Sequence, residues 1–204
     1  MKKFHSIAAV AMPMDTVNLD TDQLIPARFI RKPRDDENYH RYLLHDLRFD
    51  ENGAERPKFV FNLQPYRVAQ IIVGARNFGC GSSREAAVFA LDANDFRAVV
   101  APSYGDIFFN NCFKDGILPV VLDEAVVDGL RAKLYAEPGA QLTIDLETQI
   151  LSGPDGAQHP FEVDPFRKHC LLNGLDDIQL TLEHEVEMDT FEAAYRKEMD
   201  WLYR

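Results

Sequence analysis

A loop rich in glycine and serine, residues 74–85, carries the residue types best suited to binding an anion. Its glycines permit backbone conformations that other residues avoid, and they let a ligand approach the main chain closely. Arg84 adds a planar guanidinium that can bind a carboxylate through two hydrogen bonds, and the hydroxyls of Ser82 and Ser83 add further donors. These residue types predict a carboxylate or phosphate site in this loop.

The loop does not match the common phosphate or nucleophile motifs. Cys80 and Gly81 stand where a Walker A sequence has lysine and a hydroxyl residue, and Arg84 replaces the third glycine of a dinucleotide-binding loop. No G-x-S-x-G elbow is present. From spacing alone, a turn that merely caps a helix and leaves Arg84 in solvent remains an open alternative.

The elements around this loop predict an α/β fold. Short apolar runs alternate with helix-length segments, which is typical of parallel strands joined by crossover helices. Because Ser82 and Glu85 have the S-x-x-E spacing of a capping box, we expect a helix that begins at Ser82 or Ser83 and adds unpaired N–H groups to the anion site. Strands are expected at residues 70–73, 97–101 and 117–122, and helices at 83–93, 104–114 and 124–136.

The remainder of the chain predicts an edge hairpin and a helical end. Strand-like runs at 142–146 and 161–163 flank a turn signal at 152–156. Asp164 can cap a further helix, and residues 183–204 have the pattern of a polar amphipathic helix. No linker divides the 204 residues, so we expect a single domain over 1–204.

Composition excludes several function classes. A net charge of -11 disfavours nucleic acid and anionic membranes as partners, since both require a basic surface. The basic run formed by Arg28, Arg31, Lys32 and Arg34 is the one local exception, although such runs are usually solvated loops. Three widely spaced cysteines predict neither a disulfide framework nor a metal site. No secretion signal or membrane-length apolar stretch is evident, so we expect a cytoplasmic protein.

Four segments resemble one known family. Residues 77–85, with the sequence NFGCGSSRE, closely resemble the signature of the swivelling domain of the aconitase family. Residues 18–26, 103–119 and 166–176 resemble, in the same order, the small subunits of bacterial isopropylmalate dehydratases. The resemblance covers about residues 5–185 and implies a swivelling β/β/α domain, with residues 186–204 as a helical tail.

The resemblance implies a hydro-lyase that is active only with a large subunit, in a heterodimer or higher heteromer. The expected reaction converts 2-isopropylmalate into 3-isopropylmalate by dehydration and rehydration, in leucine biosynthesis. In this family a [4Fe–4S] cluster assists the reaction, and the resemblance places it on the large subunit, with no cofactor or metal bound by this chain. The expected ligand is a small dicarboxylate.

The resemblance also implies roles for particular residues. Ser82, Ser83 and Arg84 match residues that bind the substrate carboxylates, and Ser83 also matches the hydroxyl that serves proton transfer. Asp22 resembles a partner for a catalytic histidine across the subunit interface. Arg34 matches an arginine that contacts the distal part of the substrate, with Arg31 as the second choice.

Two departures from the family pattern leave alternatives open. The family motif continues with histidine after the glutamate, whereas this chain has Ala86, and the segment 26–37 is unusually acidic after Arg34. A related hydro-lyase acting on citraconate, 2-methylmalate, dimethylmalate or homoaconitate would share the same motifs. A non-catalytic paralogue that only binds a large subunit is the alternative of a different class.

Overall fold

The computed structural model describes residues 1–82 and 84–203. The chain divides into two compact units, Met1–Gly174 and Leu175–Arg204. The first unit holds the sheet and all of its strands, and the second is helical. The expectation of one domain over the whole chain stays a prediction.

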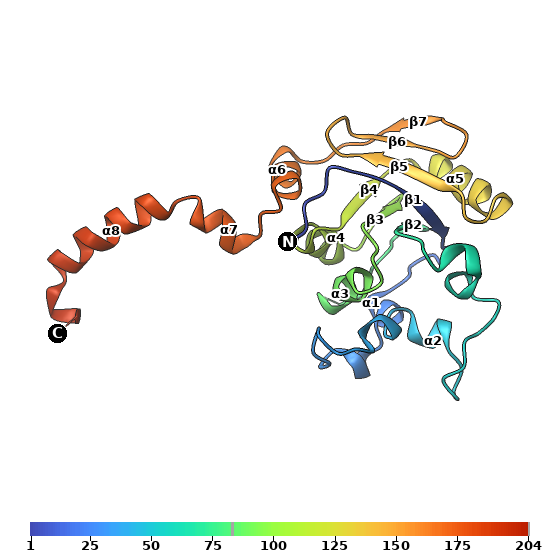
Figure 1. Ribbon diagram of the computed structural model, residues 1–204, viewed down its shortest axis with the longest axis horizontal. Helices are drawn as coiled ribbons and strands as arrows, with labels where there is room; N and C mark the ends of the chain where they lie inside the picture. The colour runs from blue at the N-terminus through green and yellow to red at the C-terminus, as the bar shows by residue number, and fades with distance from the viewer. Residues whose placement is uncertain (83, 204) are drawn as a thin grey trace. The chain divides into compact units, whose positions relative to one another are not determined.

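A sheet of seven strands forms the first unit, in the order β4-β3-β2-β1-β5-β6-β7 (Figure 1). Strands β4, β3, β2 and β1 pair in parallel, and β1, β5, β6 and β7 pair antiparallel. The predicted α/β class, with parallel central strands and a hairpin at the edge, is confirmed. The strands are β1 (Ser6–Pro13), β2 (Ile71–Val73), β3 (Ala98–Ala101), β4 (Leu118–Val121), β5 (Gln141–Asp145), β6 (Ile150–Ser152) and β7 (Gln158–Pro160).

Burial on both faces explains why the parallel strands read as continuous apolar runs. Every residue of β2 and β3 is buried. Alternate side chains point to opposite faces, so Ile72 and Val99 enter one apolar core while Ile71 and Val100 enter another. The sheet therefore separates two cores.

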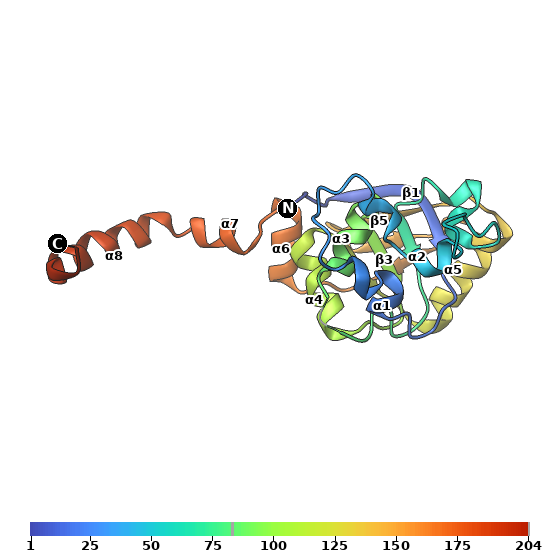
Figure 2. The same cartoon turned by 90° about the horizontal axis from the view of Figure 1, so that it is seen from below.

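Helices and irregular segments cover the two faces. The first core packs against α3 and the short helices of residues 21–66, and the second packs against α5 and α6 (Figures 1 and 2). The α-helices are α1 (Thr21–Leu24), α2 (His45–Arg48), α3 (Ala86–Asp92), α4 (Asp106–Asp115), α5 (Glu124–Ala136), α6 (Pro165–Asn173), α7 (Asp177–Leu182) and α8 (Glu185–Glu198). The 3-10 helices are η1 (Ala27–Phe29), η2 (Tyr39–Arg41), η3 (Val60–Asn62), η4 (Gln64–Tyr66) and η5 (Asp200–Tyr203).

Several expected elements are confirmed and others differ. The strands expected at 70–73, 97–101 and 117–122 are β2, β3 and β4, and the helix after Asp164 is α6, capped by that carboxylate. The strand expected at 161–163 lies instead at 158–160, and β1 and β6 were not predicted. β7 shifts toward the turn because it pairs in register with β6, which places Gln158 opposite Ser152.

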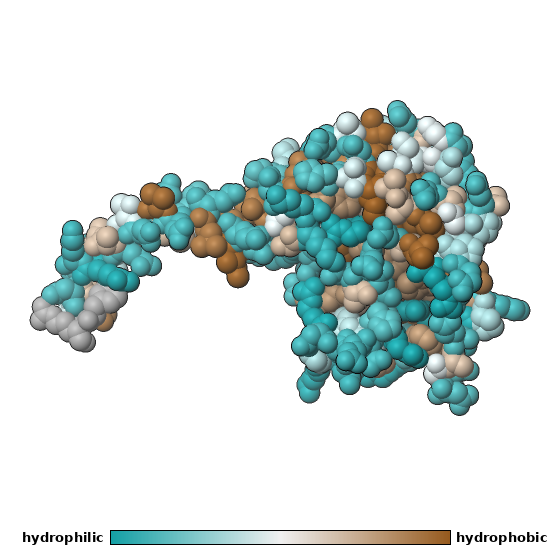
Figure 3. Space-filling model, viewed as in Figure 1, coloured by the Kyte–Doolittle hydropathy of each residue, from teal (hydrophilic) through white to brown (hydrophobic). Residues whose placement is uncertain are grey.

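The second unit is polar and carries scattered apolar side chains (Figure 3). Asp176 caps α7 in a capping box with Gln179, and α8 confirms the helix expected in this segment. Exposed apolar residues along the unit are Ile178, Leu182, Val186, Phe191, Trp201 and Leu202. Within the described part of the chain, no helix is long and apolar enough to cross a membrane.

Candidate functional site

Three loops meet at the edge of the sheet where the parallel strands end. One loop follows β1, the 74–85 loop follows β2, and a third, residues 102–105, follows β3. Because β1, β2 and β3 are adjacent and parallel, their carboxyl ends lie at the same edge, which is where open α/β sheets bind ligands. The sheet topology therefore brings together three of the segments that carry the family resemblance.

Two asparagines join the first loop to the second. Asn18 and Asn77 both adopt left-handed backbone conformations, with φ of 55° and 58°, which asparagine tolerates better than most residues. The side-chain amide of Asn77 donates to the side-chain oxygen of Asn18 at 2.8 Å. The N–H of Gly79 donates to the carbonyl of Leu19 at 2.7 Å, so the two loops run side by side.

Helix α1 continues this contact with the 74–85 loop. Asp20 caps the helix through a capping box with Gln23. The N–H of Thr21 donates to the carbonyl of Cys80 at 2.8 Å, and the Thr21 hydroxyl lies within hydrogen-bond distance of Ser82. A one-turn helix thus holds the loop in place.

Asp22 and Arg84 form an ion pair next to this contact. Nη1 of Arg84 donates to Oδ1 of Asp22. The Arg84 side chain is 22% exposed and that of Asp22 is 57% exposed, so both can still reach a ligand. A guanidinium carries five N–H donors, and a bond to Asp22 leaves donors for a substrate carboxylate.

Close packing against the loop fixes its backbone. Gly105 approaches so closely that a Cβ added there would lie 2.6 Å from the carbonyl oxygen of Gly79. Gly79 has φ +69°, and a Cβ on it would overlap the ring of Phe108, which is 2% exposed. Tyr104, next to Gly105, has its hydroxyl 2.6 Å from the carbonyl of Val99, so this third segment is anchored to the sheet.

The helix after the loop begins later than expected. Its first residue is Ala86 and its N-cap is Glu85, without a side-chain capping bond, so the expected capping box between Ser82 and Glu85 does not form. The hydroxyl of Ser82 lies against Thr21 instead. Helix α3 therefore starts beyond Arg84, and Ser82 and Arg84 belong to the loop. Ala86, at the position of the family histidine, is 8% exposed and packs in the first core.

Arg34 contacts the other end of α3. Its guanidinium carbon lies 3.7 Å from the centroid of the Phe89 ring. Its terminal nitrogens lie 3.5 Å from a carboxylate oxygen of Asp115 and 3.8 Å from one of Asp92. These contacts occur at the carboxyl-terminal half of α3, whereas Arg84 precedes its first turn. Arg31 is exposed in the neighbouring turn.

The cysteines lie in three different elements. Cys112 and Cys170 are buried in α4 and α6, while Cys80 lies in the 74–85 loop and its thiol donates to the carbonyl of Asn18 at 3.4 Å. Burial, and secondarily the Asp20 carboxylate, raise the pKa of the Cys80 thiol. The described residues hold no group of three His, Cys, Asp or Glu side chains that could bind a metal ion.

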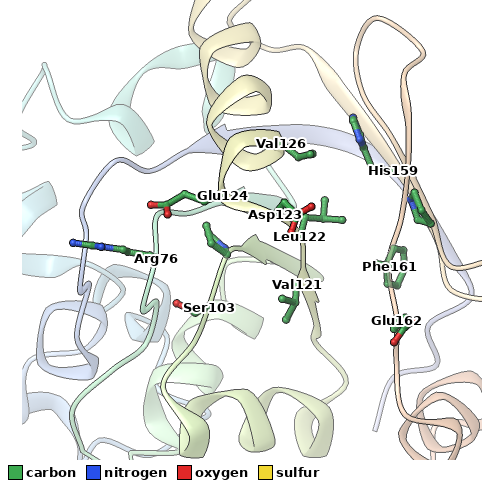
Figure 4. A pocket seen from close by; sticks show the side chains of 12 residues that line it. Arg76, Ser103, Val121, Leu122, Asp123, Glu124, Val126, His159, Phe161 and Glu162 are labelled. Atoms are coloured by element: carbon green, nitrogen blue, oxygen red, sulfur yellow. The ribbon is translucent and has the colours of Figure 1, made fainter.

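A cleft of about 790 Å³ opens beside the same edge of the sheet (Figure 4). Val121 and Leu122 at the end of β4, with Phe161 just after β7, form apolar parts of its lining. Asp123 and Glu124 contribute carboxylates from the start of α5. The cleft borders the 74–85 loop, because Ser103, which lines it, accepts the Asn77 N–H at 2.9 Å.

The structure thus brings together three of the expected site residues, Asp22, Ser82 and Arg84. Ser83, expected between the last two, lies outside the described residues. Arg34 contacts Asp92 and Asp115 instead of the loop, and Arg31 is exposed. The asparagine pair and the buried Thr21 hydroxyl were not predicted. An asparagine beside a glycine-rich turn is the sequence signal that could have indicated the asparagine pair. The burial of Thr21 depends on the fold and has no such signal.

Comparison with known proteins agrees with this arrangement. A family model described as the aconitase C-terminal domain matches residues 1–125, one described as LeuD_N matches 128–165, and one described as the C-terminal domain of the 3-isopropylmalate dehydratase small subunit matches 177–204. The chain is 50% identical to a 3-isopropylmalate dehydratase small subunit of Rhodospirillum centenum, covering 98% of both sequences. It is 48% identical to one of Parvibaculum lavamentivorans, covering 99% of this chain and all of the relative.

A solved structure shows the same fold. The 3-isopropylmalate dehydratase of Methanocaldococcus jannaschii aligns with a TM-score of 0.65 at 22% identity, covering 91% of this chain and 98% of that one. Fold and loop together define the class as an α/β domain of the aconitase C-terminal type. Within that class, the chain belongs to the family of 3-isopropylmalate dehydratase small subunits.

Proposed function

We propose that this chain acts as the small subunit of an isopropylmalate isomerase and holds the carboxylates of the substrate. The observation that carries the proposal is the placement of Ser82 and Arg84 on one loop, at the carboxyl edge of the parallel strands. The relatives that match over nearly their whole length are 3-isopropylmalate dehydratase small subunits, which supports 2-isopropylmalate as the substrate. The reaction removes the hydroxyl of 2-isopropylmalate together with a proton from the neighbouring carbon, then adds water back with the two positions exchanged.

The residues of this chain bind and orient the substrate. Arg84 pairs with one carboxylate, and the Ser82 hydroxyl donates to the same or the second carboxylate. Asp22 keeps the guanidinium directed at the site, and in the complex it faces a catalytic histidine of the partner. Ser83 supplies the hydroxyl for proton transfer. Such fixed donors lower the barrier by stabilising charge without reorganisation.

Arg31 and Arg34 form the distal part of the proposed site. In the structure Arg34 is bound at Asp92 and Asp115, so substrate contact requires its side chain to leave these carboxylates. Arg31 needs no such release. We assign recognition of the substrate side chain to this segment, because it carries the basic run of a chain that is otherwise strongly acidic.

The proposal includes a partner. The [4Fe–4S] cluster, which binds the substrate hydroxyl, is carried by a large subunit, and together the two chains form a heterodimer or higher heteromer. The naming of the relatives as small subunits supports this assignment. A cytoplasmic location belongs to the same proposal, since an oxygen-sensitive cluster suits a reducing compartment.

The test is an anaerobic assay of the reconstituted complex. The chain is co-expressed with its large subunit, the cluster is reconstituted, and formation of the enediacid from 2-isopropylmalate is followed by absorbance. Arg84→Ala should lower kcat/KM by about a hundredfold or more, because a charged donor to the substrate is lost. Arg67→Ala, which breaks an exposed ion pair with Glu55, is the matched control and should leave the rate unchanged.

Two results would contradict the proposal. Full activity of Arg84→Ala would exclude the loop as the carboxylate site. An assembled wild-type complex with an intact cluster but no turnover of 2-isopropylmalate would exclude the substrate, and turnover of citraconate, 2-methylmalate, dimethylmalate or homoaconitate would then identify the replacement. Assembly without turnover of any of these would identify a non-catalytic paralogue.

A further inference from the structure

Thr21 differs from the other buried polar side chains of the described residues in what it contacts. Thr21 is 1% exposed, and the remaining members of this group are Arg48 and Asn62. Arg48 and Asn62 bond to backbone carbonyls within residues 40–56. Thr21 contacts a residue 61 positions away, in the 74–85 loop.

All three polar atoms of Ser82 lie around the Thr21 hydroxyl. The Ser82 N–H donates to Oγ1 of Thr21 at 3.2 Å, and Oγ1 donates to the Ser82 carbonyl at 3.2 Å. The two hydroxyl oxygens are 3.4 Å apart. A hydroxyl has one hydrogen and two lone pairs, so Thr21 can satisfy the Ser82 N–H while its hydrogen points either to the Ser82 carbonyl or to the Ser82 hydroxyl.

The loop wraps around this hydroxyl. Gly81 has φ +100°, and a Cβ added there would lie 3.4 Å from Oγ1 of Thr21. The Thr21 N–H donates to the carbonyl of Cys80, so residues 80 and 82 are both bonded to this threonine. The next residue of α1, Asp22, pairs with Arg84. Consecutive residues of one capped helix turn therefore hold both Ser82 and Arg84.

We propose that Thr21 is a positioning residue for substrate binding, an inference that rests on the proposed function of the loop. When a carboxylate arrives, the Thr21 hydrogen turns from the Ser82 carbonyl to the Ser82 hydroxyl oxygen. The Ser82 hydrogen is then directed at the carboxylate, and the two hydroxyls form a chain in which each bond strengthens the next. Thr21 itself does not touch the substrate.

Thr21→Val tests the proposal, since valine keeps the shape of the side chain and removes the hydroxyl. Two measurements are made on the full chain, alone and in the reconstituted complex. Amide hydrogen exchange at Ser82 reports the Thr21 bond without any need for activity. Steady-state kinetics with 2-isopropylmalate separates KM from kcat.

The expected results distinguish positioning from stability. Thr21→Val should speed exchange of the Ser82 amide at least tenfold. It should also lower kcat/KM by about ten- to a hundredfold, mainly by raising KM, which is the size of effect expected from losing one or two neutral hydrogen bonds. Thr21→Ser restores the hydroxyl and should restore both values. Thr16→Val, which removes a nearby hydroxyl that contacts the Met14 sulfur, is the control and should change neither.

Three outcomes would overturn the inference. The first is a Ser82 amide that stays as protected in Thr21→Val as in the wild type. The second is a wild-type KM in Thr21→Val. The third is a loss of kcat/KM that is equal in Thr21→Ser and Thr21→Val and is accompanied by an equal loss of thermal stability in both variants. If the wild-type complex does not turn over 2-isopropylmalate, the proposed function fails, while the exchange measurement still decides whether Thr21 holds Ser82.

Discussion

Replacing Asp115 with asparagine should make the stability of this protein less sensitive to pH. Asp115 is the last residue of α4, and its side chain is 13% exposed. One of its carboxylate oxygens, Oδ2, is buried with no hydrogen-bond partner among the described residues. The pKa of this carboxyl is raised from 3.8 to about 6, mainly by burial and also by the nearby Glu85 and Asp92, against the opposing effect of the Arg34 guanidinium.

The sign of the effect follows from the raised pKa. A carboxyl with a higher pKa in the folded state binds its proton more tightly there, so its contribution is most favourable below pH 3.8 and is lost as the pH rises through 6. The whole shift corresponds to about 3 kcal/mol, at about 1.4 kcal/mol for each pKa unit. About 1 kcal/mol of this loss falls between pH 5 and pH 7.

The assay is urea unfolding of wild type and Asp115→Asn, followed by circular dichroism at pH 5, 6 and 7. The free energy of unfolding of the wild type should fall relative to the variant by about 1 kcal/mol from pH 5 to pH 7. That corresponds to roughly 0.5 M in the urea midpoint. Asparagine keeps the size of the side chain and an oxygen that can accept from Arg34, so packing changes little.

Asp155→Asn is the control. Hydrogen bonding to Lys133 lowers the pKa of Asp155 below its usual value, so this carboxylate is charged throughout the range tested. Its removal should shift stability by the same amount at pH 5 and pH 7. If the difference between wild type and Asp115→Asn were also constant to within about 0.3 kcal/mol, the buried carboxylate would not titrate as described, and the reasoning would be refuted.

Two further predictions concern packing and a buried hydroxyl. Gly79→Ala should lower stability by about 1–3 kcal/mol and reduce activity, because residue 79 has a positive φ and the added methyl group would overlap the buried Phe108 ring. Urea unfolding and the isomerase assay check this prediction. Unchanged activity would contradict it and show that the loop can shift to accommodate the methyl group. Tyr66→Phe should cost about 1 kcal/mol, since its hydroxyl donates to the Leu134 carbonyl at 2.8 Å in the interior; a thermal midpoint equal to that of the wild type would contradict it.

The sequence was informative where a single physical requirement dominates. Strands β2, β3 and β4 were predicted because parallel strands covered on both faces must be apolar throughout. Strand β1 was missed, since its three alanines have weak strand preference and its conformation depends on pairing with β2 and β5. Its position in the sheet is a property of the whole fold.

The candidate site, like the fold, could be predicted from the sequence only in part. The residue types of Ser82 and Arg84 predicted one site, the family resemblance added Asp22, and the structure places the three together. The capping role expected for Ser82 failed because its hydroxyl is engaged by Thr21, a residue far away in sequence. Arg34 could not be placed from its neighbours, because the carboxylates that hold it belong to α3 and α4.

The central position of β1 has a consequence for how the chain folds during synthesis. Residues 6–13 are synthesised well before their partner strands, because Ala11 pairs with Ile71 and Ala9 with Leu142. At about 5–20 residues per second, this strand waits on the order of 10 s before its last partner exists. Both of its edges are unpaired for much of that time, and such edges favour aggregation. The yield of folded protein should therefore rise when a chaperone shields the first strand during synthesis.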